Sequence, residues 1–161
     1  MSSNSNIIAL TMGDPSGVGT EIAIRAKIKK IKKPDFFIIH DIDFVKKILK
    51  KMNSKLKVIE ISSPSEVKKL PKNYLAVLPI KISKNTQLGK KNLSNVKSIL
   101  TSIDLAVKLA KNGEVAAIVT NPINKDVIGK KVKNFKGHTE YLAKKDRTND
   151  QLMMMINKNL K

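Results

Sequence analysis

The chain has 161 residues, of which 41% are hydrophobic, so it can bury one domain core and is not a disordered protein. It contains no cysteine, which excludes disulfides, thiolate metal sites and a cysteine nucleophile. The formal net charge is +19, but only two of the 32 basic residues, Arg25 and Arg147, are arginines, and aromatic residues make up only 4%. Because bidentate phosphate contacts favour arginine and base stacking needs aromatic rings, we do not expect a nucleic-acid partner.

Neither terminal nor internal segments predict a membrane association. Residues 1–6 lack the basic patch and apolar run of a secretory signal. No apolar stretch has the length of a membrane span. We therefore expect a cytoplasmic protein with no membrane partner.

The first predicted unit is a strand followed by a helix. Residues 6–11 are a short apolar run, which predicts a buried strand, and a glycine-rich turn follows over 12–19. Apolar residues at helical spacing then predict a helix over 20–31. Thr20 is its predicted N-cap.

The next elements repeat the alternation. Residues 35–40 predict a second strand, and the amphipathic pattern over 41–52 predicts a helix with Asp41 as its N-cap. Two further apolar runs, at 57–61 and 74–80, predict strands, with a turn between them.

The last part of the chain begins with the clearest helical pattern. Apolar residues recur at helical spacing over 92–111, and Gly113 is placed to end that helix. Residues 115–119 predict a buried strand, and so does the run 152–156. Apolar strands that alternate with amphipathic helices predict an α/β fold with a mainly parallel sheet flanked by helices.

In open parallel sheets, ligands bind beyond the carboxyl ends of the strands. The glycine-rich turn lies at such an end, with the spacing Gly-x3-Gly-x-Gly, which is neither the dinucleotide fingerprint nor the P-loop. Two interpretations remain open for it: a ligand loop with Gly13 and Asp14 as contacts, or a tight strand-to-helix turn.

A second candidate segment, residues 120–125, follows the predicted strand 115–119. Its Lys125 either pairs with a phosphate or carboxylate or is simply a solvated lysine. From the residues alone, in a chain so rich in lysine, the solvated state is favoured.

The third candidate segment, residues 137–140, holds one of the two histidines of the chain, His138. His138 precedes Thr139, a predicted helix N-cap, and both side chains can hydrogen-bond a substrate. The other histidine, His40, is expected to be a satisfied residue at a strand end. No cluster of histidines and carboxylates predicts a metal site.

Taken together and in this order, residues 11–19, 118–125 and 137–143 resemble the 4-hydroxythreonine-4-phosphate dehydrogenase family of pyridoxal phosphate biosynthesis. The resemblance implies an isocitrate/isopropylmalate-dehydrogenase-like fold of two α/β domains. It implies that 1–161 is a truncated N-terminal portion, with 1–120 in the first domain and 121–161 at the start of the second.

The resemblance also implies a reaction. The family oxidises 4-phosphooxy-L-threonine with NAD or NADP to a 3-keto acid, which loses carbon dioxide to give 3-amino-2-oxopropyl phosphate. It implies a divalent metal (Zn, Mg or Co) and a homodimer. His138 and Thr139 match the family's substrate-binding pair, whereas the metal-binding histidines are expected beyond Lys161. No catalytic residue can be assigned.

Two departures and two alternatives accompany the resemblance. Thr20 and Lys136 stand where the family often has proline, which loosens the adjacent loops without changing the chemistry. A related dehydrogenase acting on threonate or erythronate 4-phosphate would show a similar His-Thr pair. The chain could also be a catalytically inactive fragment or binding module, and we expect the 161 residues alone to lack dehydrogenase activity.

Overall fold

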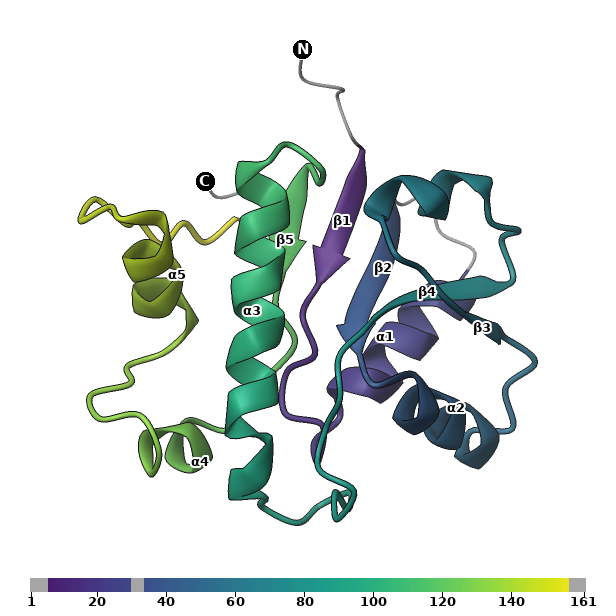
Figure 1. Cartoon of the computed structure of the whole chain (residues 1–161), viewed down its shortest axis with the longest axis horizontal. Coiled ribbons are helices and arrows are strands. Elements are labelled where there is room, and N and C mark those ends of the chain that lie inside the picture. Colours follow the sequence, from purple (N-terminus) through teal and green to yellow (C-terminus); the bar gives the residue numbers. More distant parts are fainter. Residues whose placement is uncertain (1–5, 30–33, 157–161) are drawn as a thin grey trace.

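The computed structural model describes residues 6–29 and 34–156. Five strands form one parallel sheet in the order β3-β4-β2-β1-β5 (Figure 1). The strands are β1 (Ile7–Leu10), β2 (Asp35–His40), β3 (Lys57–Glu60), β4 (Tyr74–Pro79) and β5 (Ala117–Val119). The mainly parallel sheet flanked by helices confirms the predicted fold class.

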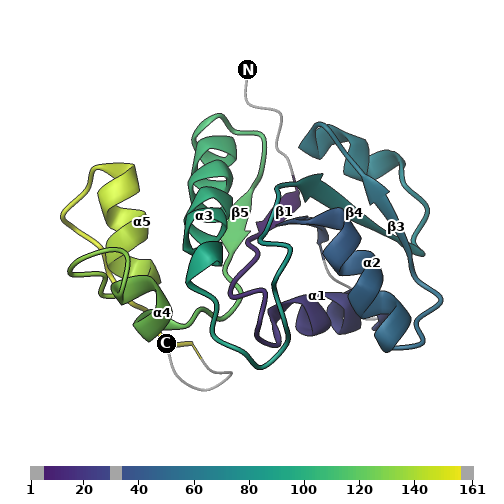
Figure 2. The ribbon, with the colours of Figure 1, turned by 60° about the horizontal axis from the view of Figure 1, so that its bottom comes forward.

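Helices cover both faces of this sheet (Figure 2). Side chains of α1 and α2 pack on one face, and side chains of α3 and the 3-10 helix η1 pack on the other. The helical elements are α1 (Gly19–Ile28), α2 (Ile42–Lys51), η1 (Pro64–Lys69), η2 (Leu93–Asn95), α3 (Val96–Lys111), α4 (Lys125–Gly129) and α5 (His138–Asp146).

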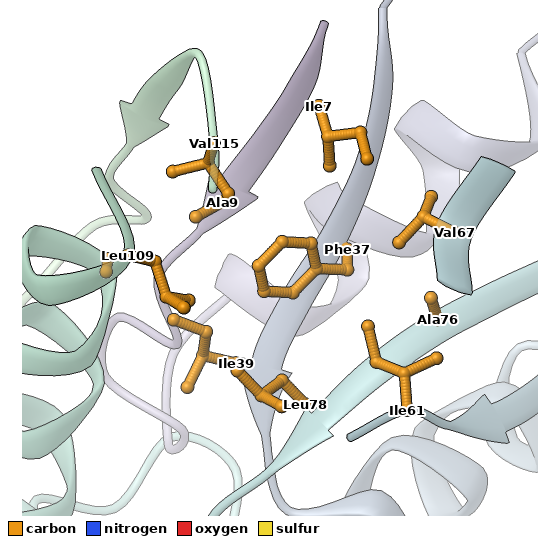
Figure 3. Close-up of a cluster of buried hydrophobic side chains, with 11 residues drawn as sticks. Ile7, Ala9, Phe37, Ile39, Ile61, Val67, Ala76, Leu78, Leu109 and Val115 are labelled. Carbon is orange, nitrogen blue, oxygen red and sulfur yellow. The ribbon is translucent and has the colours of Figure 1, made fainter. Parts of the chain in front are cut away.

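Strand β2 shows why its sequence is apolar at consecutive positions. Phe36 and Ile38 join the cluster under α1 and α2, whereas Phe37 and Ile39 point to the opposite face. Figure 3 shows Phe37 in the middle of that second cluster, between side chains from β1, η1 and α3. Because successive residues of a strand point to opposite faces, burial of both faces requires an uninterrupted apolar run.

Most predicted elements are confirmed, including two helix ends. The Asp41 side chain accepts hydrogen bonds from the backbone N–H groups of Asp43 and Phe44, both at 3.0 Å, as an N-cap does. Gly113 follows α3 with φ +71°, in the left-handed region that glycine adopts most readily. The predicted helix over 92–111 divides into η2 and α3.

Three predictions of local structure are wrong. Thr20 is not an N-cap: α1 starts at Gly19, and the Thr20 hydroxyl lies 2.9 Å from Nε2 of His40. The helix ends at Ile28, and Ile31, where the prediction ended, lies outside the described residues. The run 152–156 is not a buried strand, because each of its side chains is at least 63% exposed and no described strand lies beside it.

The prediction over 115–119 is only partly confirmed. Strand β5 covers Ala117–Val119 and pairs with β1 along one side only, so it forms an edge of the sheet. Ala117 and Val119 are exposed, whereas Val115 is buried. None of the helices in the described part of the chain is long and apolar enough to span a bilayer.

Candidate functional site

Pairing of β1 with β5 brings the first two candidate segments together at the carboxyl edge of the sheet. Beyond the strand pair, the N–H of Thr11 donates to the carbonyl of Val119 at 2.9 Å. The N–H of Asp14 then donates to the carbonyl of Pro122 at 2.8 Å. The two loops therefore continue the parallel ladder past the ends of their strands.

Asn121 joins the loops a second time. Its side-chain amide donates to the carbonyl of Thr11 at 3.0 Å, and its backbone N–H donates to the Thr11 hydroxyl at 3.3 Å. Asn121 is buried, so both bonds are made away from water. Asn121 was not among the residues predicted for this segment, although a polar residue directly after a strand is a signal for such a contact.

Gly13 is required where these loops meet. Its φ is +70°, and a Cβ built on it would lie 2.6 Å from the carbonyl oxygen of Pro122 and 2.7 Å from Cβ of Asn121. The space that glycine leaves is thus filled by the chain itself. The Asp14 carboxylate accepts the N–H of Ser16 at 2.9 Å, as in an Asx turn. A ligand contact by Gly13 or Asp14 stays a prediction.

The second and third candidate segments also meet. Lys125 opens α4, and its side chain reaches Gly137, where an added Cβ would lie 3.3 Å from Lys125 Cε and 3.5 Å from Lys125 Nζ. Gly137 is buried and is the N-cap residue of α5, which starts at His138. The prediction that Thr139 caps this helix is wrong by two positions, because Thr139 lies within the first turn.

His138 keeps an unsatisfied ring nitrogen. Its Nε2 is buried and has no hydrogen-bond partner among the described residues. Partial burial lowers the pKa of His138 below 6.5, and the positive charge of Lys125 lowers it further. The ring is therefore neutral at pH 7 and can offer Nε2 to a bound molecule, as a donor or as an acceptor depending on its tautomer.

His40 differs, and its predicted role as a satisfied strand-end residue is confirmed. Nδ1 of His40 accepts the backbone N–H of Asp41 at 2.7 Å, so the proton sits on Nε2, which faces the Thr20 hydroxyl at 2.9 Å. The ring stacks on Phe44 with the two ring planes 6° apart. Burial lowers the pKa of His40 to about 4, against the opposing attraction of the Asp41 carboxylate.

Polar contacts that the sequence pattern did not reveal fix α5 against α3. The Tyr141 hydroxyl donates to Asp104 at 2.8 Å, and Lys145 pairs with the same carboxylate at 2.7 Å. Burial, followed by the Asp104 carboxylate, raises the pKa of the Tyr141 hydroxyl. Because α5 carries His138 at its first position, these contacts hold the imidazole relative to the rest of the domain.

The side chains of this chain do not make a metal site by themselves. Over residues 6–29 and 34–156 there is no group of three or more histidine, aspartate or glutamate side chains able to hold a metal ion. The half-buried imidazole of His138 has Lys125 and a single carboxylate, that of Glu140, near it. A divalent metal therefore does not fit the residues present, and no chemical step is assigned through one.

Together these features describe an open parallel α/β domain in which the loops after β1 and β5 meet at the carboxyl edge of the sheet, and the Lys125 side chain reaches the start of α5. A family model described as pyridoxal phosphate biosynthetic protein PdxA matches residues 32–161. The chain therefore belongs to the pyridoxal phosphate biosynthetic protein PdxA family.

Curated relatives and solved structures support the same family. A 4-hydroxythreonine-4-phosphate dehydrogenase of Trichlorobacter lovleyi is 35% identical over 92% of this chain and 45% of its own length. One of Wigglesworthia glossinidia brevipalpis is 30% identical over 96% and 46%. A crystal structure of 4-hydroxythreonine-4-phosphate dehydrogenase from Klebsiella pneumoniae superposes with a TM-score of 0.83 at 28% identity, over 91% of this chain and 46% of that one. The chain thus spans slightly less than half the length of these relatives.

Proposed function

We propose that this protein contributes the substrate-binding His-Thr pair of a 4-hydroxythreonine-4-phosphate dehydrogenase, acting on 4-phosphooxy-L-threonine in pyridoxal 5'-phosphate biosynthesis. The observation that carries the proposal is the unsatisfied Nε2 of His138, directly after the Gly137 that the Lys125 side chain approaches, while the loop before Lys125 is hydrogen-bonded to the glycine-rich turn. The names of the similar proteins support this substrate.

In this proposal the chain binds and orients the substrate. His138 is neutral, so it hydrogen-bonds the substrate without adding charge, while Thr139 offers its hydroxyl and a backbone N–H of the first turn of α5. Lys125 supplies a positive charge to an anionic group. NAD or NADP would supply the hydride acceptor: the secondary alcohol would lose a hydride from its carbon and the proton from its hydroxyl, and the resulting 3-keto acid would lose carbon dioxide to give 3-amino-2-oxopropyl phosphate.

The resemblance to the family also carries proposals for assembly. A homodimer and a cytoplasmic location are expected for the active protein. A contribution of residues 121–161 to a second domain is likewise proposed. In the described part of that range, α4 packs on the start of α3 through Val127 and Ile128.

A fusion tests the function directly. This chain is joined to the remaining sequence of the Trichlorobacter lovleyi relative, and NAD and NADP reduction are each followed with 4-phosphooxy-L-threonine and Mg²⁺, Zn²⁺ or Co²⁺. We expect activity in the fusion and none in the 161 residues alone. His138→Gln should lower kcat/KM by about 100-fold, which corresponds to the loss of an active-site hydrogen bond worth about 2–3 kcal/mol.

The matched control is Lys144→Gln, an exposed change on the same helix, and it should leave kcat/KM unchanged. Equal activity of the His138→Gln and parent fusions would contradict the proposed substrate contact. A higher kcat/KM for threonate or erythronate 4-phosphate than for the amino acid phosphate would instead assign the protein to the related hydroxy acid dehydrogenases.

A further inference from the structure

Lys125 is a cation with no anionic partner in the described part of the chain. None of the ion pairs among the described residues includes it. The neighbouring acid, Asp126, pairs with Lys91 at 3.4 Å instead. The Glu140 carboxylate also lies near Gly137, with Oε2 3.5 Å from the position of an added Cβ, but it makes no ion pair with Lys125 within 4.0 Å.

The backbone of Lys125 is held firmly. Two other residues of helix α4, Val127 and Ile128, are buried in a cluster with Met12 and Ile99. The Asn124 side chain caps the helix by accepting the N–H of Val127 at 3.2 Å. An unpaired lysine on an anchored element loses less conformational freedom on binding an anion than one on a free loop.

The Lys125 ammonium lies near two groups that can bind an anion, His138 and the first N–H groups of α5, and near one carboxylate, that of Glu140. Lys125 Nζ would lie 3.5 Å from a Cβ added at Gly137, the residue directly before His138, and the positive charge of Lys125 lowers the pKa of His138. The first helical bond of α5 runs from the N–H of Tyr141 to the carbonyl of Gly137. The three preceding N–H groups therefore have no acceptor within the helix, and the positive end of its dipole lies there.

We propose that Lys125 is a ligand-contacting residue that, together with His138 and the first N–H groups of α5, binds an oxyanion of the substrate. The inference rests on the proposed function for the identity of that substrate, which carries both a phosphate and a carboxylate. Gly137 is part of the arrangement, because a Cβ there would lie 3.3 Å from Lys125 Cε, so the lysine side chain would have to shift slightly.

Binding of an anion at this site should change the pKa of His138, which can be measured. An oxyanion beside Lys125 offsets the positive charge that now disfavours the imidazolium form, so binding should raise the pKa of His138. The charged groups near the imidazole are Lys125 from α4 and Glu140 from α5, with Lys136 two positions earlier in the loop. A change at Lys125 should therefore alter the pKa of His138 even without any ligand.

The experiment follows the His138 Cε1–H resonance by NMR in the 161-residue chain, which has only two histidines. His138→Gln identifies the signal. The pH titration is recorded for the parent, Lys125→Met, Lys125→Arg and the matched control Lys130→Met, which removes an exposed charge at the end of the same helix. Inorganic phosphate and, separately, acetate are then added at constant ionic strength.

We expect phosphate or acetate to change the chemical shift of the His138 Cε1–H resonance in a saturable way. The anion with the lower dissociation constant identifies the kind of oxyanion bound. Lys125→Met should raise the pKa of His138 in the free protein and weaken anion binding by about tenfold, the effect of losing one hydrogen bond from a charged donor. Lys125→Arg and Lys130→Met should retain the His138 pKa and the anion affinity of the parent protein. If Lys125→Met does not fold by circular dichroism, Lys125→Gln replaces it.

Two results would overturn the inference: no saturable response to either anion, or a response and a His138 pKa that are the same in the Lys125→Met and parent proteins. Neither result bears on the fusion assay with His138→Gln. Conversely, an inactive fusion would leave the anion response and its dependence on Lys125 intact, so failures of the two proposals are distinguishable.

Discussion

The two histidines of this chain lie at similar places in the fold, but their ring nitrogens differ in whether they have hydrogen-bond partners. Each stands next to the start of a helix, and burial lowers the pKa of each. Around His40 both ring nitrogens have partners within the chain, whereas around His138 the buried Nε2 has none among the described residues. The comparison teaches that a depressed pKa alone does not mark a ligand site, and that an unsatisfied polar atom beside an unpaired cation is the better indication.

The largest expected effect is on the pH dependence of stability. The pKa of His40 is about 4 in the folded chain and near 6.5 when unfolded, so the unfolded state binds more protons between these values. The contribution of His40 to the free energy of unfolding is therefore fully present above pH 6.5. It falls as the pH drops toward 4, by about 3 kcal/mol if the whole pKa shift is realised. Urea denaturation at a series of pH values measures this.

In this titration His40→Phe should remove most of the pH dependence between pH 6.5 and 4, while His138→Gln should keep it. A dependence that survives in His40→Phe would show that the histidine regions do not differ in the way described.

The second effect concerns the partner of His40. Thr20→Val deletes the hydroxyl that faces Nε2 and leaves that N–H buried without an acceptor. The free energy of unfolding should fall by about 1–3 kcal/mol, the cost of an unsatisfied buried donor. Thr139→Val is the matched control at the other histidine, and a loss of stability as large as that of Thr20→Val would refute the contrast.

The smallest effect is expected at His138 itself. Because Nε2 makes no hydrogen bond within the described chain, His138→Gln should change the free energy of unfolding by about 0.5 kcal/mol or less at pH 7. Thermal unfolding of the two proteins at the same concentration tests this. A large loss would mean that His138 is a structural residue like His40.

Sequence reasoning predicted most of the fold because the elements that it placed are defined by local periodicity. The apolar run of β2 and the stripe of α3 each specify their own element. The run 152–156 has an equally apolar pattern, but a pattern does not show which neighbour covers it, and here its side chains are exposed. Thr20 failed as a cap for the same reason, since its partner, His40, is brought close only by the parallel sheet.

The sequence named His138 and Thr139 as candidate site residues and left Lys125 open, but it could not predict their contacts. The position of Asn121 after a strand was a usable signal. The approach of Lys125 to Gly137 depends on the path of the chain over the eleven residues between them, which has no period. The polar contacts of Tyr141 and Lys145 with Asp104 likewise depend on how α5 meets α3.

The meeting of Gly13 with Pro122 also bears on how the protein folds. The contacts of Asn121 with Thr11 join residues 110 positions apart, so they form only after one of the longest loops in the domain has closed. Such distant pairings carry a high entropic cost in the folding transition state. The contact between these two loops should therefore be among the last parts of the domain to assemble, and hydrogen exchange at Thr11, Asp14 and Asn121 should be faster than at the buried centre of β2.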